Sequence, residues 1–326
     1  MNTDHDRTST ADDLSAATVP TFYFIGVTTG GSSIRRVFPL WAAELGLGDV
    51  VLAGIDLPVH APAEDYRRVV EFIKHDPLSL GALVTTHKLD LFRAAADVFD
   101  EVDPLAELMH EVSSISKRDG RLVAHAKDPI SSGLALDAFV PPGHFATSGA
   151  ELVVFGAGGS AIAIDWYLTR TGRGADVPSR VVVTNRDDQR LKALRAVHEA
   201  SGAQVVLDTR RADDPSVNDA VLAAAPVGSV VINATGLGKD APGSPISADA
   251  PFPGHALVWD LNYRGDLVFL DQARAQESQR GLHVEDGWTY FVHGWTQVIA
   301  EVFDVTIPTS GPGFDRLSDL AASTRS

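Results

Sequence analysis

The chain has 326 residues, of which 44% are hydrophobic and 21% are charged, and it contains no cysteine. At about 150 residues per domain, this length predicts about two globular domains. The missing cysteines exclude disulfides, thiolate nucleophiles, iron–sulfur clusters and cysteine-bound zinc. The 27 Lys and Arg against 43 Asp and Glu give a net charge of −16, which repels phosphate backbones and anionic lipid. We therefore expect neither nucleic acid nor a membrane surface as a partner.

The sequence contains no apolar stretch of about 18 residues, so we expect no transmembrane helix. Residues 1–20 are rich in Asp, Thr, Ser and Ala and lack both a basic start and an apolar stretch. They therefore do not resemble a signal peptide. We expect a disordered lead over residues 1–20 and, by default, a cytoplasmic protein.

From residue 21 onward, short apolar runs alternate with helix-like stretches. In the first half we expect strands over 22–27, 50–55 and 81–85, and helices over 37–45, 63–75 and 90–99. In the second half we expect strands over 151–155, 181–185, 204–207, 229–233 and 256–261, and helices over 161–171, 189–200 and 290–305. This alternation predicts parallel sheets with helices on their faces.

A glycine-rich turn follows the first strand of the second half. Residues 152–161 read Leu-Val-Val-Phe-Gly-Ala-Gly-Gly-Ser-Ala and match the dinucleotide-binding pattern G-x-G-x-x-A. Gly156 permits the tight turn, Gly158 lets the backbone approach a pyrophosphate, and Ala161 allows the helix to pack closely on the strand. Because a strand precedes the turn and a helix and second strand follow it, we favour a nucleotide site over a plain strand–turn–helix.

The next strand ends where the adenosine ribose of a bound dinucleotide would lie, in the residues Asn-Arg-Asp-Asp-Gln-Arg at 185–190. Arg186 and Arg190 could hold a 2′-phosphate, which favours NADP. Asp187 or Asp188 could instead accept a hydrogen bond from a free 2′-hydroxyl, which favours NAD. Either aspartate could also be the N-cap of the following helix. These alternatives stay open at the level of the sequence.

The chain resembles the shikimate/quinate dehydrogenase family in a series of motifs that keep the family's order. Residues 83–88, Leu-Val-Thr-Thr-His-Lys, are similar to the family's Val-Thr-x-Pro-x-Lys. Residues 119–128, Asp-Gly-Arg-Leu-Val-Ala-His-Ala-Lys-Asp, are similar to its Asp-Gly-x-Leu-x-Gly-x-Asn-Thr-Asp. Other family motifs correspond to the glycine loop, to Asn-Arg at 185–186, to Asn-Ala-Thr-Gly-Leu-Gly at 233–238, to Asp-Leu-Asn-Tyr at 260–263 and to Asp-Gly at 286–287.

The resemblance implies an NAD(P)-dependent alcohol dehydrogenase with a two-domain α/β fold. It implies an N-terminal α/β substrate domain, a Rossmann-type parallel-sheet dinucleotide-binding domain, and a last helix that returns to the first domain. The family's catalytic pair carries over to Lys88 and Asp128. Hydride leaves a secondary alcohol carbon only as the hydroxyl proton is removed, so a positioned base is required. Without cysteine or a dense His or carboxylate cluster, we expect no catalytic metal.

The same resemblance places the domain borders and the site residues. We expect a substrate-binding and catalytic domain over 21–132, an NAD(P)-binding domain over 133–285, and over 286–326 a C-terminal helix on the substrate domain with a frayed tail after 308. The expected cofactor-binding residues are Gly156, Ala157, Gly158, Gly159, Ser160, Asn185, Arg186, Asp187, Arg190, Asn233, Ala234, Thr235 and Gly287. The expected substrate-binding residues are Ser32, Ser33, Thr85, Ser113, Lys127, Tyr263 and Gln297.

Departures from the family pattern fall where a substrate would bind. Residues 26–34 align with Gly-x-Pro-Ile-x-His-Ser-x-Ser, so Ile34 replaces the second of two carboxylate-binding serines. Ser113 replaces an asparagine, Ala-Lys replaces Asn-Thr at 126–127, and Gly294 replaces a glutamine, with Gln297 as a displaced candidate. Because unpaired buried polar groups are costly, losing these partners argues against the family's usual recognition of shikimate.

Our leading hypothesis is an oxidoreductase that moves a hydride between NADP or NAD and a hydroxyl of a shikimate-like cyclic hydroxy acid or cyclitol, as a monomer or homodimer. In this hypothesis Lys127 binds an anionic substituent of the substrate; the alternative is a solvated loop lysine. Two alternative hypotheses are that the protein is a shikimate 5-dehydrogenase with an altered pocket, or that it is a nucleotide-binding regulatory protein without catalysis. The presence of both Lys88 and Asp128 favours an enzyme.

Overall fold

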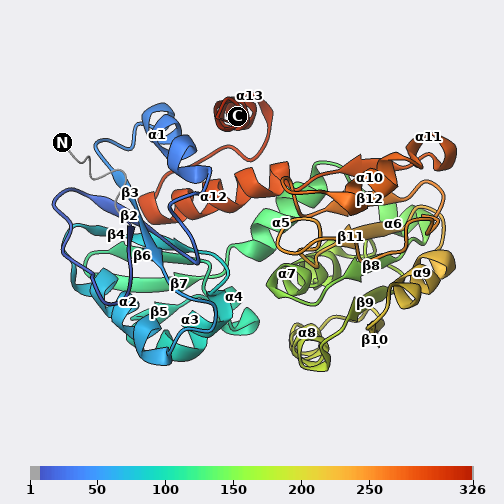
Figure 1. The fold of residues 1–326 in the computed structure, drawn as a ribbon, viewed down its shortest axis with the longest axis horizontal. Coiled ribbons are helices and arrows are strands. Elements are labelled where there is room, and N and C mark those ends of the chain that lie inside the picture. Colours follow the sequence, from blue (N-terminus) through green and yellow to red (C-terminus); the bar gives the residue numbers. More distant parts are fainter. Residues whose placement is uncertain (1–7, 325–326) are drawn as a thin grey trace. The chain divides into compact units, whose positions relative to one another are not determined.

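The structure, a computed structural model, describes residues 8–324 (Figure 1). The chain forms two compact units. Unit 1 contains the chain up to Lys127 together with the chain from Val292 onward, and unit 2 is Asp128–Phe291. We expected the borders after residues 132 and 285. The first border lies earlier because α5 (Asp128–Asp137) packs on a helix of unit 2, α7 (Gly159–Thr169).

Unit 1 is built on a seven-stranded sheet in the order β1-β3-β2-β4-β6-β7-β5. Its strands are β1 (Thr8–Ser9), β2 (Thr21–Gly26), β3 (Val51–Asp56), β4 (Ser79–Val84), β5 (Glu101–Val102), β6 (Ser114–Arg118) and β7 (Arg121–His125). The strands β1 to β4 are parallel, whereas β6 is antiparallel to both β4 and β7. The adjacent parallel strands β3, β2 and β4 therefore end at the same edge of the sheet.

Helices cover both faces of this sheet (Figure 1). The helices of unit 1 are α1 (Ile34–Glu44), α2 (Ala63–His75), α3 (Lys88–Ala95), the short 3-10 helix η2 (Ala96–Val98), α4 (Pro104–Met109), α13 (Gly311–Ala322) and most of α12 (Trp288–Phe303). On one face, Tyr66, Val69, Val70 and Ile73 of α2 enter the core at helical spacing. On the other face, Phe22 of β2 meets Phe38 of α1 and Phe303 of α12, each with ring centroids 5.6 Å apart. Alternating strand residues thus fill two cores, each buried aliphatic or aromatic side chain contributing about 1.5–3 kcal/mol.

Residues 8–20 are not a disordered lead, which corrects our expectation. The strand β1 pairs with β3, and Ala11 is only 6% exposed and joins the core of unit 1. The backbone N–H of Ala17 donates to Oδ2 of Asp76 at 2.9 Å. A two-residue strand and one buried alanine leave no periodic pattern to detect. Residues 1–7 of the expected lead lie outside the described residues.

The expected fraying after residue 308 is also wrong, because α13 forms there and packs on α1. Nε1 of Trp41 donates to the carbonyl of Leu317 at 2.8 Å, which anchors the helix. Its buried side chains are Phe314, Leu317 and Ala321. Their spacing of three and four residues is the amphipathic signal that the Pro and Gly residues of this segment concealed.

Unit 2 is a doubly wound domain with a parallel six-stranded sheet in the order β10-β9-β8-β11-β12-β13. The strands are β8 (Leu152–Phe155), β9 (Val181–Asn185), β10 (Leu207–Arg211), β11 (Val230–Asn233), β12 (Leu257–Asp260) and β13 (His283–Glu285). Numbered within the unit, this is 3-2-1-4-5-6, the order of dinucleotide-binding Rossmann folds. The order reverses between β8 and β11, and ligands of such sheets bind at the carboxyl ends of the strands at that point.

The helices of unit 2 precede the first of these strands or connect one strand to the next. They are α5, α6 (His144–Ser148), α7, the 3-10 helix η3 (Thr171–Arg173), α8 (Asp188–Ala200), α9 (Pro215–Ala224), α10 (Val268–Arg274) and α11 (Glu277–Arg280). Two strands differ from our expectation: β10 covers Leu207–Arg211 rather than 204–207, and β13 was not expected. The strand β10 is an edge strand with the half-polar sequence Leu-Asp-Thr-Arg-Arg, so no apolar run marks it.

Candidate active site

The glycine loop of unit 2 lies at the switch point between β8 and β11. Gly156 has φ +107°, and a Cβ there would lie 2.5 Å from the carbonyl oxygen of Ala234. The N–H of Gly156 donates to the carbonyl of Thr184 at 2.8 Å, and the N–H of Ala234 donates to that of Phe155 at 2.7 Å. The loop therefore crosses the end of β11 so closely that only glycine fits.

The helix α7 begins directly after this loop. Its N-cap, Gly158, has extended backbone and offers no side chain to the first N–H groups of the helix. Uncapped N–H groups and the positive end of the helix dipole are the features that hold a pyrophosphate. Ala161 is fully buried, as close helix–strand packing requires. The hydroxyl of Tyr290 on α12 donates to Oγ of Ser160 at 3.3 Å.

The end of β9 settles which aspartate caps α8. Asp187 is the N-cap, and its Oδ1 accepts from the N–H of Gln189 at 2.8 Å. Its own N–H donates to Oδ1 of Asn185 at 3.0 Å. Nε of Arg190 lies 3.9 Å from Oδ2 of Asp187. The same guanidinium lies 3.6 Å from the position that a Cβ on Gly158 would take, so it reaches back over the glycine loop.

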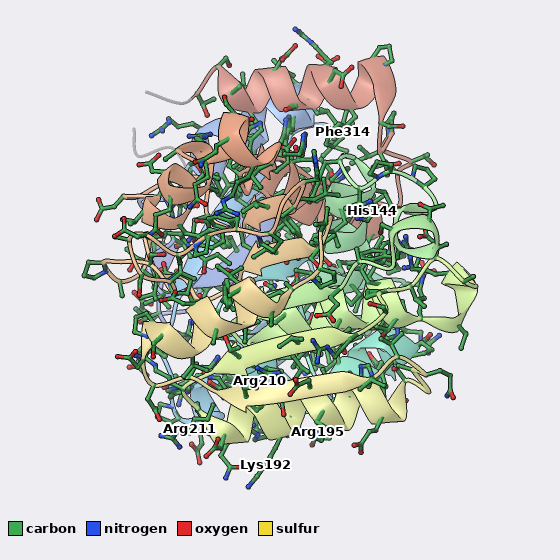
Figure 2. The ribbon with its side chains drawn as sticks, turned by 90° about the vertical axis from the view of Figure 1, so that its right-hand side faces the viewer. His144, Lys192, Arg195, Arg210, Arg211 and Phe314 are labelled. Carbon is green, nitrogen blue, oxygen red and sulfur yellow. The ribbon has the colours of Figure 1, made fainter. Side chains whose placement is uncertain are left out.

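Arg211, at the end of β10, pairs with the other aspartate. Its Nη1 lies 2.9 Å from Oδ2 of Asp188, and Nε and Nη2 bind both carboxylate oxygens of Asp213 at 2.7 and 3.0 Å. Figure 2 shows Arg211 with Lys192, Arg195 and Arg210, which extend from α8 and β10. This corner of unit 2 therefore groups several basic side chains, of which Arg210 and Arg211 are paired with carboxylates.

The ends of β11 and β12 are joined by a buried amide–carboxylate network. Nδ2 of Asn233 donates to Oδ1 of Asp260 at 3.2 Å, and the N–H of Asn262 donates to the same oxygen at 2.9 Å. Oδ1 of Asn233 accepts from both the N–H and Oγ1 of Thr235, at 3.1 and 2.6 Å. Burial, reinforced by the charge of Asp286, raises the pKa of Asp260 to about 6. The network fixes the loop after β11 beside the glycine turn.

Tyr263, just beyond β12, belongs to an aromatic cluster of unit 2. Its ring centroid is 4.9 Å from that of Phe291 and 5.7 Å from that of Trp288. Gly287 precedes these α12 residues, and a Cβ there would lie 2.0 Å from the carbonyl oxygen of Leu261. The close approach of Gly287 therefore places the start of α12 against the end of β12.

Asp128, in the same unit, is the first residue of α5 and is 7% exposed.

The carboxyl edge of the unit 1 sheet gathers polar residues from β2, β3 and β4. Oγ1 and N–H of Thr29 both donate to Oδ1 of Asp56, at 2.6 and 2.8 Å. Thr85 donates its N–H to the carbonyl of Ile25 at 3.0 Å. A Cβ on Gly26 would lie 3.1 Å from Cγ2 of Thr85 and 3.2 Å from Cγ2 of Thr29, so this glycine leaves room for both threonines.

Ser32 and Ser33 follow on the loop into α1, and both are partly buried. Ser33 is the N-cap of α1 without a side-chain cap bond. Its Oγ is buried with no hydrogen-bond partner among the described residues. An unpaired buried hydroxyl is costly, so such a group is suited to an external ligand. Ile34 is fully buried and takes part in the core.

Lys88 is the first residue of α3, directly after the loop from β4. The preceding loop is shaped by Thr86, which has φ +60°. His87 is 1% exposed, and its Nδ1 lies 3.1 Å from the hydroxyl of Tyr66. The carbonyl of Lys88 accepts from the N–H of Val112 at 3.1 Å. The backbone of Lys88 is therefore tied to the segment that enters β6.

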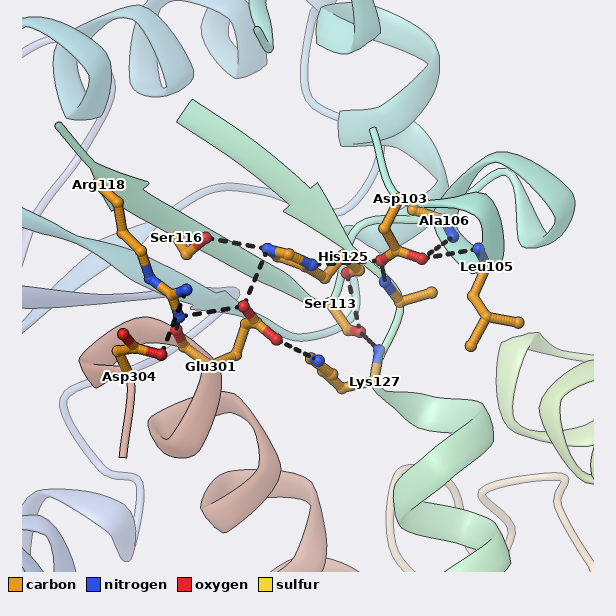
Figure 3. Close-up of polar contacts among 11 residues, drawn as sticks. Asp103, Leu105, Ala106, Ser113, Ser116, Arg118, His125, Lys127, Glu301 and Asp304 are labelled. Carbon is orange, nitrogen blue, oxygen red and sulfur yellow. Dashed lines mark hydrogen bonds and ion pairs between the residues drawn. The ribbon is translucent and has the colours of Figure 1, made fainter. Parts of the chain in front are cut away.

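Ser113 and Lys127 come together beside α12 (Figure 3). Oγ of Ser113 accepts from the N–H of Lys127 at 2.6 Å. Nζ of Lys127 lies 2.5 Å from Oε2 of Glu301, and both side chains are 21% exposed. Lys127 is thus neither a solvated lysine nor an uncompensated charge. Gln297 lies on α12, one helical turn before Glu301, and is partly buried.

No helix within residues 8–324 has the length and apolarity needed to cross a membrane. In the same range, no group of three or more His, Cys, Asp and Glu side chains is arranged to hold a metal ion.

Comparison with known proteins decides the family. No family model matches the sequence. A shikimate dehydrogenase (NADP(+)) of Methylocella silvestris is 30% identical over 304 residues, which are 92% of this chain and 96% of that protein. One of Symbiobacterium thermophilum is 30% identical over 218 residues, or 66% of this chain and 68% of that protein. The chain belongs to the shikimate dehydrogenase family.

A solved structure supports the same fold. Shikimate 5-dehydrogenase of Thermus thermophilus, in complex with NADP(H) and shikimate, matches 94% of this chain and 99% of its own, with a TM-score of 0.68 and 22% identity. As a family member, the chain is an oxidoreductase that uses NADP or NAD. Its two-domain α/β fold is confirmed.

Two residues of the site escaped the sequence analysis. Glu301 is the one acidic residue of α12, which is otherwise mostly apolar. Asp260 belongs to the Asp-Leu-Asn-Tyr motif, but only its complete burial singles it out. A lone carboxylate inside an apolar pattern was the available signal, because such a group is buried only with partners.

Proposed function

We propose that this shikimate dehydrogenase family member transfers a hydride between NADP and a secondary hydroxyl of a shikimate-like cyclic hydroxy acid or cyclitol. The observation that carries the proposal is the glycine loop at the switch point of the unit 2 sheet, with Gly156 against Ala234. Lys88 and Asp128, in motifs that resemble those of the family's catalytic pair, also support the proposal.

Lys88 and Asp128 supply the proton chemistry in this proposal. The amine of Lys88 takes the proton from the substrate hydroxyl during oxidation and returns it during reduction. The carboxylate of Asp128 orients the ammonium form by charge-assisted hydrogen bonding. When bound, the nicotinamide accepts or donates the hydride itself. Each residue stands at the first position of a helix, which fixes its backbone.

The proposed preference for NADP is supported by the interactions of Asp187 and Asp188. Asp187 is used as the cap of α8 and lies beside Arg190, and Asp188 is paired with Arg211. Arg186 is exposed next to them. Both acids that would repel a 2′-phosphate are therefore compensated, while basic groups surround the ribose position. We therefore propose NADP rather than NAD as the preferred cofactor.

The substrate proposal rests on the altered polar groups of unit 1. Ile34 and Ser113 occupy positions where the family pattern has polar side chains, and Thr29 is already bonded to Asp56. The unpaired Oγ of Ser33 remains as a donor for the substrate carboxylate or a ring hydroxyl. We therefore propose a substrate related to shikimate but with fewer recognised hydroxyls.

The test is a steady-state screen of NADP and NAD with shikimate, quinate, aminoshikimate and cyclitols. We expect turnover with NADP and at least one of these compounds. Lys88→Ala should keep the fold, measured by circular dichroism, and lose activity by a factor of about 10² or more. Full activity of Lys88→Ala would refute the mechanism. Cofactor binding without turnover of any compound would instead support the non-catalytic alternative.

A further inference from the structure

The two residues before Asp128 are held at three points within unit 1 (Figure 3). The N–H of Ala126 donates to Oδ2 of Asp103 at 3.1 Å, and the N–H of Lys127 donates to Oγ of Ser113 at 2.6 Å. The third point is the pair between Nζ of Lys127 and Oε2 of Glu301 at 2.5 Å. The residues at 113, 126 and 127 are among those that depart from the family pattern, and here they lie close together at one place in unit 1.

Three basic side chains surround the carboxylate of Glu301. Besides Lys127, Nη2 of Arg118 lies 3.2 Å and Nε2 of His125 lies 3.5 Å from its Oε1. Burial raises the pKa of Glu301, but the Lys127 hydrogen bond and the charges of His125, Lys127 and Arg118 outweigh it and hold the pKa below its usual range. Glu301 is therefore charged at neutral pH. Arg118 also lies 3.4 Å from Asp304, at the end of the same segment.

His125 links this carboxylate to the other anchor. Its Nε2 lies 2.9 Å from Oγ of Ser116, and its Nδ1 lies 3.4 Å from Oδ2 of Asp103. Asp103 in turn caps α4 through the N–H groups of Leu105 and Ala106. The network thus runs from α4 across the end of β7 to α12. The side chains of His125, Asp103, Lys127 and Glu301 are only 13–23% exposed. Removing one of them therefore leaves the charge of its partner poorly solvated.

We propose that Glu301 is a positioning residue for Asp128, acting through Lys127. The inference rests on the proposed function, in which Asp128 orients Lys88. Lys127 is bonded directly to Asp128 along the chain, so holding both its backbone N–H and its ammonium fixes where α5 begins. Misplacing a catalytic group by about 1 Å can cost about 10²-fold in rate. Glu301 therefore contributes to turnover without touching the substrate.

The experiment is a double-mutant cycle with Glu301→Gln, Lys127→Met and the double variant, using the best substrate from the screen. We expect kcat to fall about 10- to 100-fold in each variant. The double variant should be no worse than the single ones, because the two residues act as a unit. KM for NADP should stay within about twofold. Lys127→Arg, which keeps the ion pair, should recover most of the activity.

A second readout separates positioning from general loss of structure. With the substrate carrying deuterium at the carbon that is oxidised, the isotope effect on kcat should rise in Glu301→Gln and Lys127→Met, because hydride transfer becomes slower than product release. Thermal unfolding of each variant is measured alongside. The matched control is Glu101→Gln, which removes the exposed Arg121–Glu101 pair, 3.2 Å apart, from the same sheet. It should leave kcat and the isotope effect unchanged.

The outcomes distinguish this inference from the proposed function. If Lys88→Ala is inactive while Glu301→Gln and Lys127→Met keep wild-type kcat and isotope effect, the positioning role is wrong and the proposed function stands. A rise in substrate KM alone in Lys127→Met would also overturn it, because it indicates direct substrate contact. If Glu301→Gln does not fold, the comparison of Lys127→Met with Lys127→Arg decides the same question.

Discussion

The imidazole of His293 and the phenyl ring of Phe314 stack face to face, with centroids 4.3 Å apart and an interplanar angle of 15°. His293 lies on α12 and Phe314 on α13, so this stack joins the two C-terminal helices of unit 1. The imidazole is 1% exposed, and its Nδ1 has no hydrogen-bond partner among the described residues. Burial lowers the pKa of His293 to about 4. The folded chain therefore holds this ring in its neutral form.

This stack predicts a loss of stability in mild acid. As the pH falls from 6.5 to about 4, the unfolded chain binds a proton at His293 while the folded chain does not. The free energy of unfolding should fall by up to about 3 kcal/mol over this window. His293→Phe should remove that part of the pH dependence. Urea unfolding of both proteins at several pH values measures the difference, and parallel curves would contradict the prediction.

Asp260 predicts a pH dependence of the opposite sign. Its pKa is raised from 3.8 to about 6 in the fold, so the folded chain keeps a proton that the unfolded chain releases. The free energy of unfolding should therefore fall as the pH rises from 3.8 through 6, by up to about 3 kcal/mol from this group. Asp260→Asn should lack this decline. If the free energies of unfolding of the wild type and of Asp260→Asn differ by the same amount at pH 4 and at pH 7, the prediction is wrong.

Gly156→Ala should damage both the fold of the loop and cofactor binding. A Cβ would lie 2.5 Å from the carbonyl oxygen of Ala234, and the positive φ adds strain of about 1 kcal/mol or more. We expect a lower Tm and NADP binding weakened at least 10-fold. Gly172→Ala is the control, because a Cβ there meets nothing within 4 Å. Calorimetric titration with NADP measures the effect, and equal affinities of the two variants would contradict it.

Arg211→Ala should weaken NADP binding and leave NAD binding nearly unchanged. The substitution releases the carboxylate of Asp188 beside the proposed 2′-phosphate position. Because exposed charges are worth about 0.2–1 kcal/mol each, we expect a two- to fivefold loss of NADP affinity that salt screens out. Titration with 2′,5′-ADP and with 5′-AMP isolates the phosphate.

The control for this substitution is Arg210→Ala. Arg210 is the neighbouring strand residue and pairs with Asp208 at 2.7 Å, on the opposite face of β10. It should leave the affinity for 2′,5′-ADP within about twofold. Equal losses in the two variants would mean that general surface charge, rather than Arg211 itself, attracts the phosphate.

The glycine loop and the strand and helix beside it could be predicted from local sequence pattern alone. The strand, the turn at Gly156 and the following helix are each specified by neighbouring residues, and α2 and β9 have the bounds that periodicity predicts. The edge strand β10 was expected too early, at 204–207, and the strands β1, β5, β6, β7 and β13 were not expected. The pairing of β1 and β10 depends on a partner strand rather than on their own sequences. The helix α13 was missed because Gly and Pro obscured its apolar spacing.

The sequence by itself determined the class of fold and the strand, glycine turn and helix of unit 2, since these follow from local spacing. The catalytic roles of Lys88 and Asp128 stay predictions that the resemblance to the family implies. Only the tertiary structure decided that Asp187 caps α8 and that Asp188 pairs with Arg211. It also decided what Lys127 contacts. Lys127 and Glu301 are 174 positions apart. No local pattern relates them, because charges pair through space and the return of α12 to unit 1 alone brings them together.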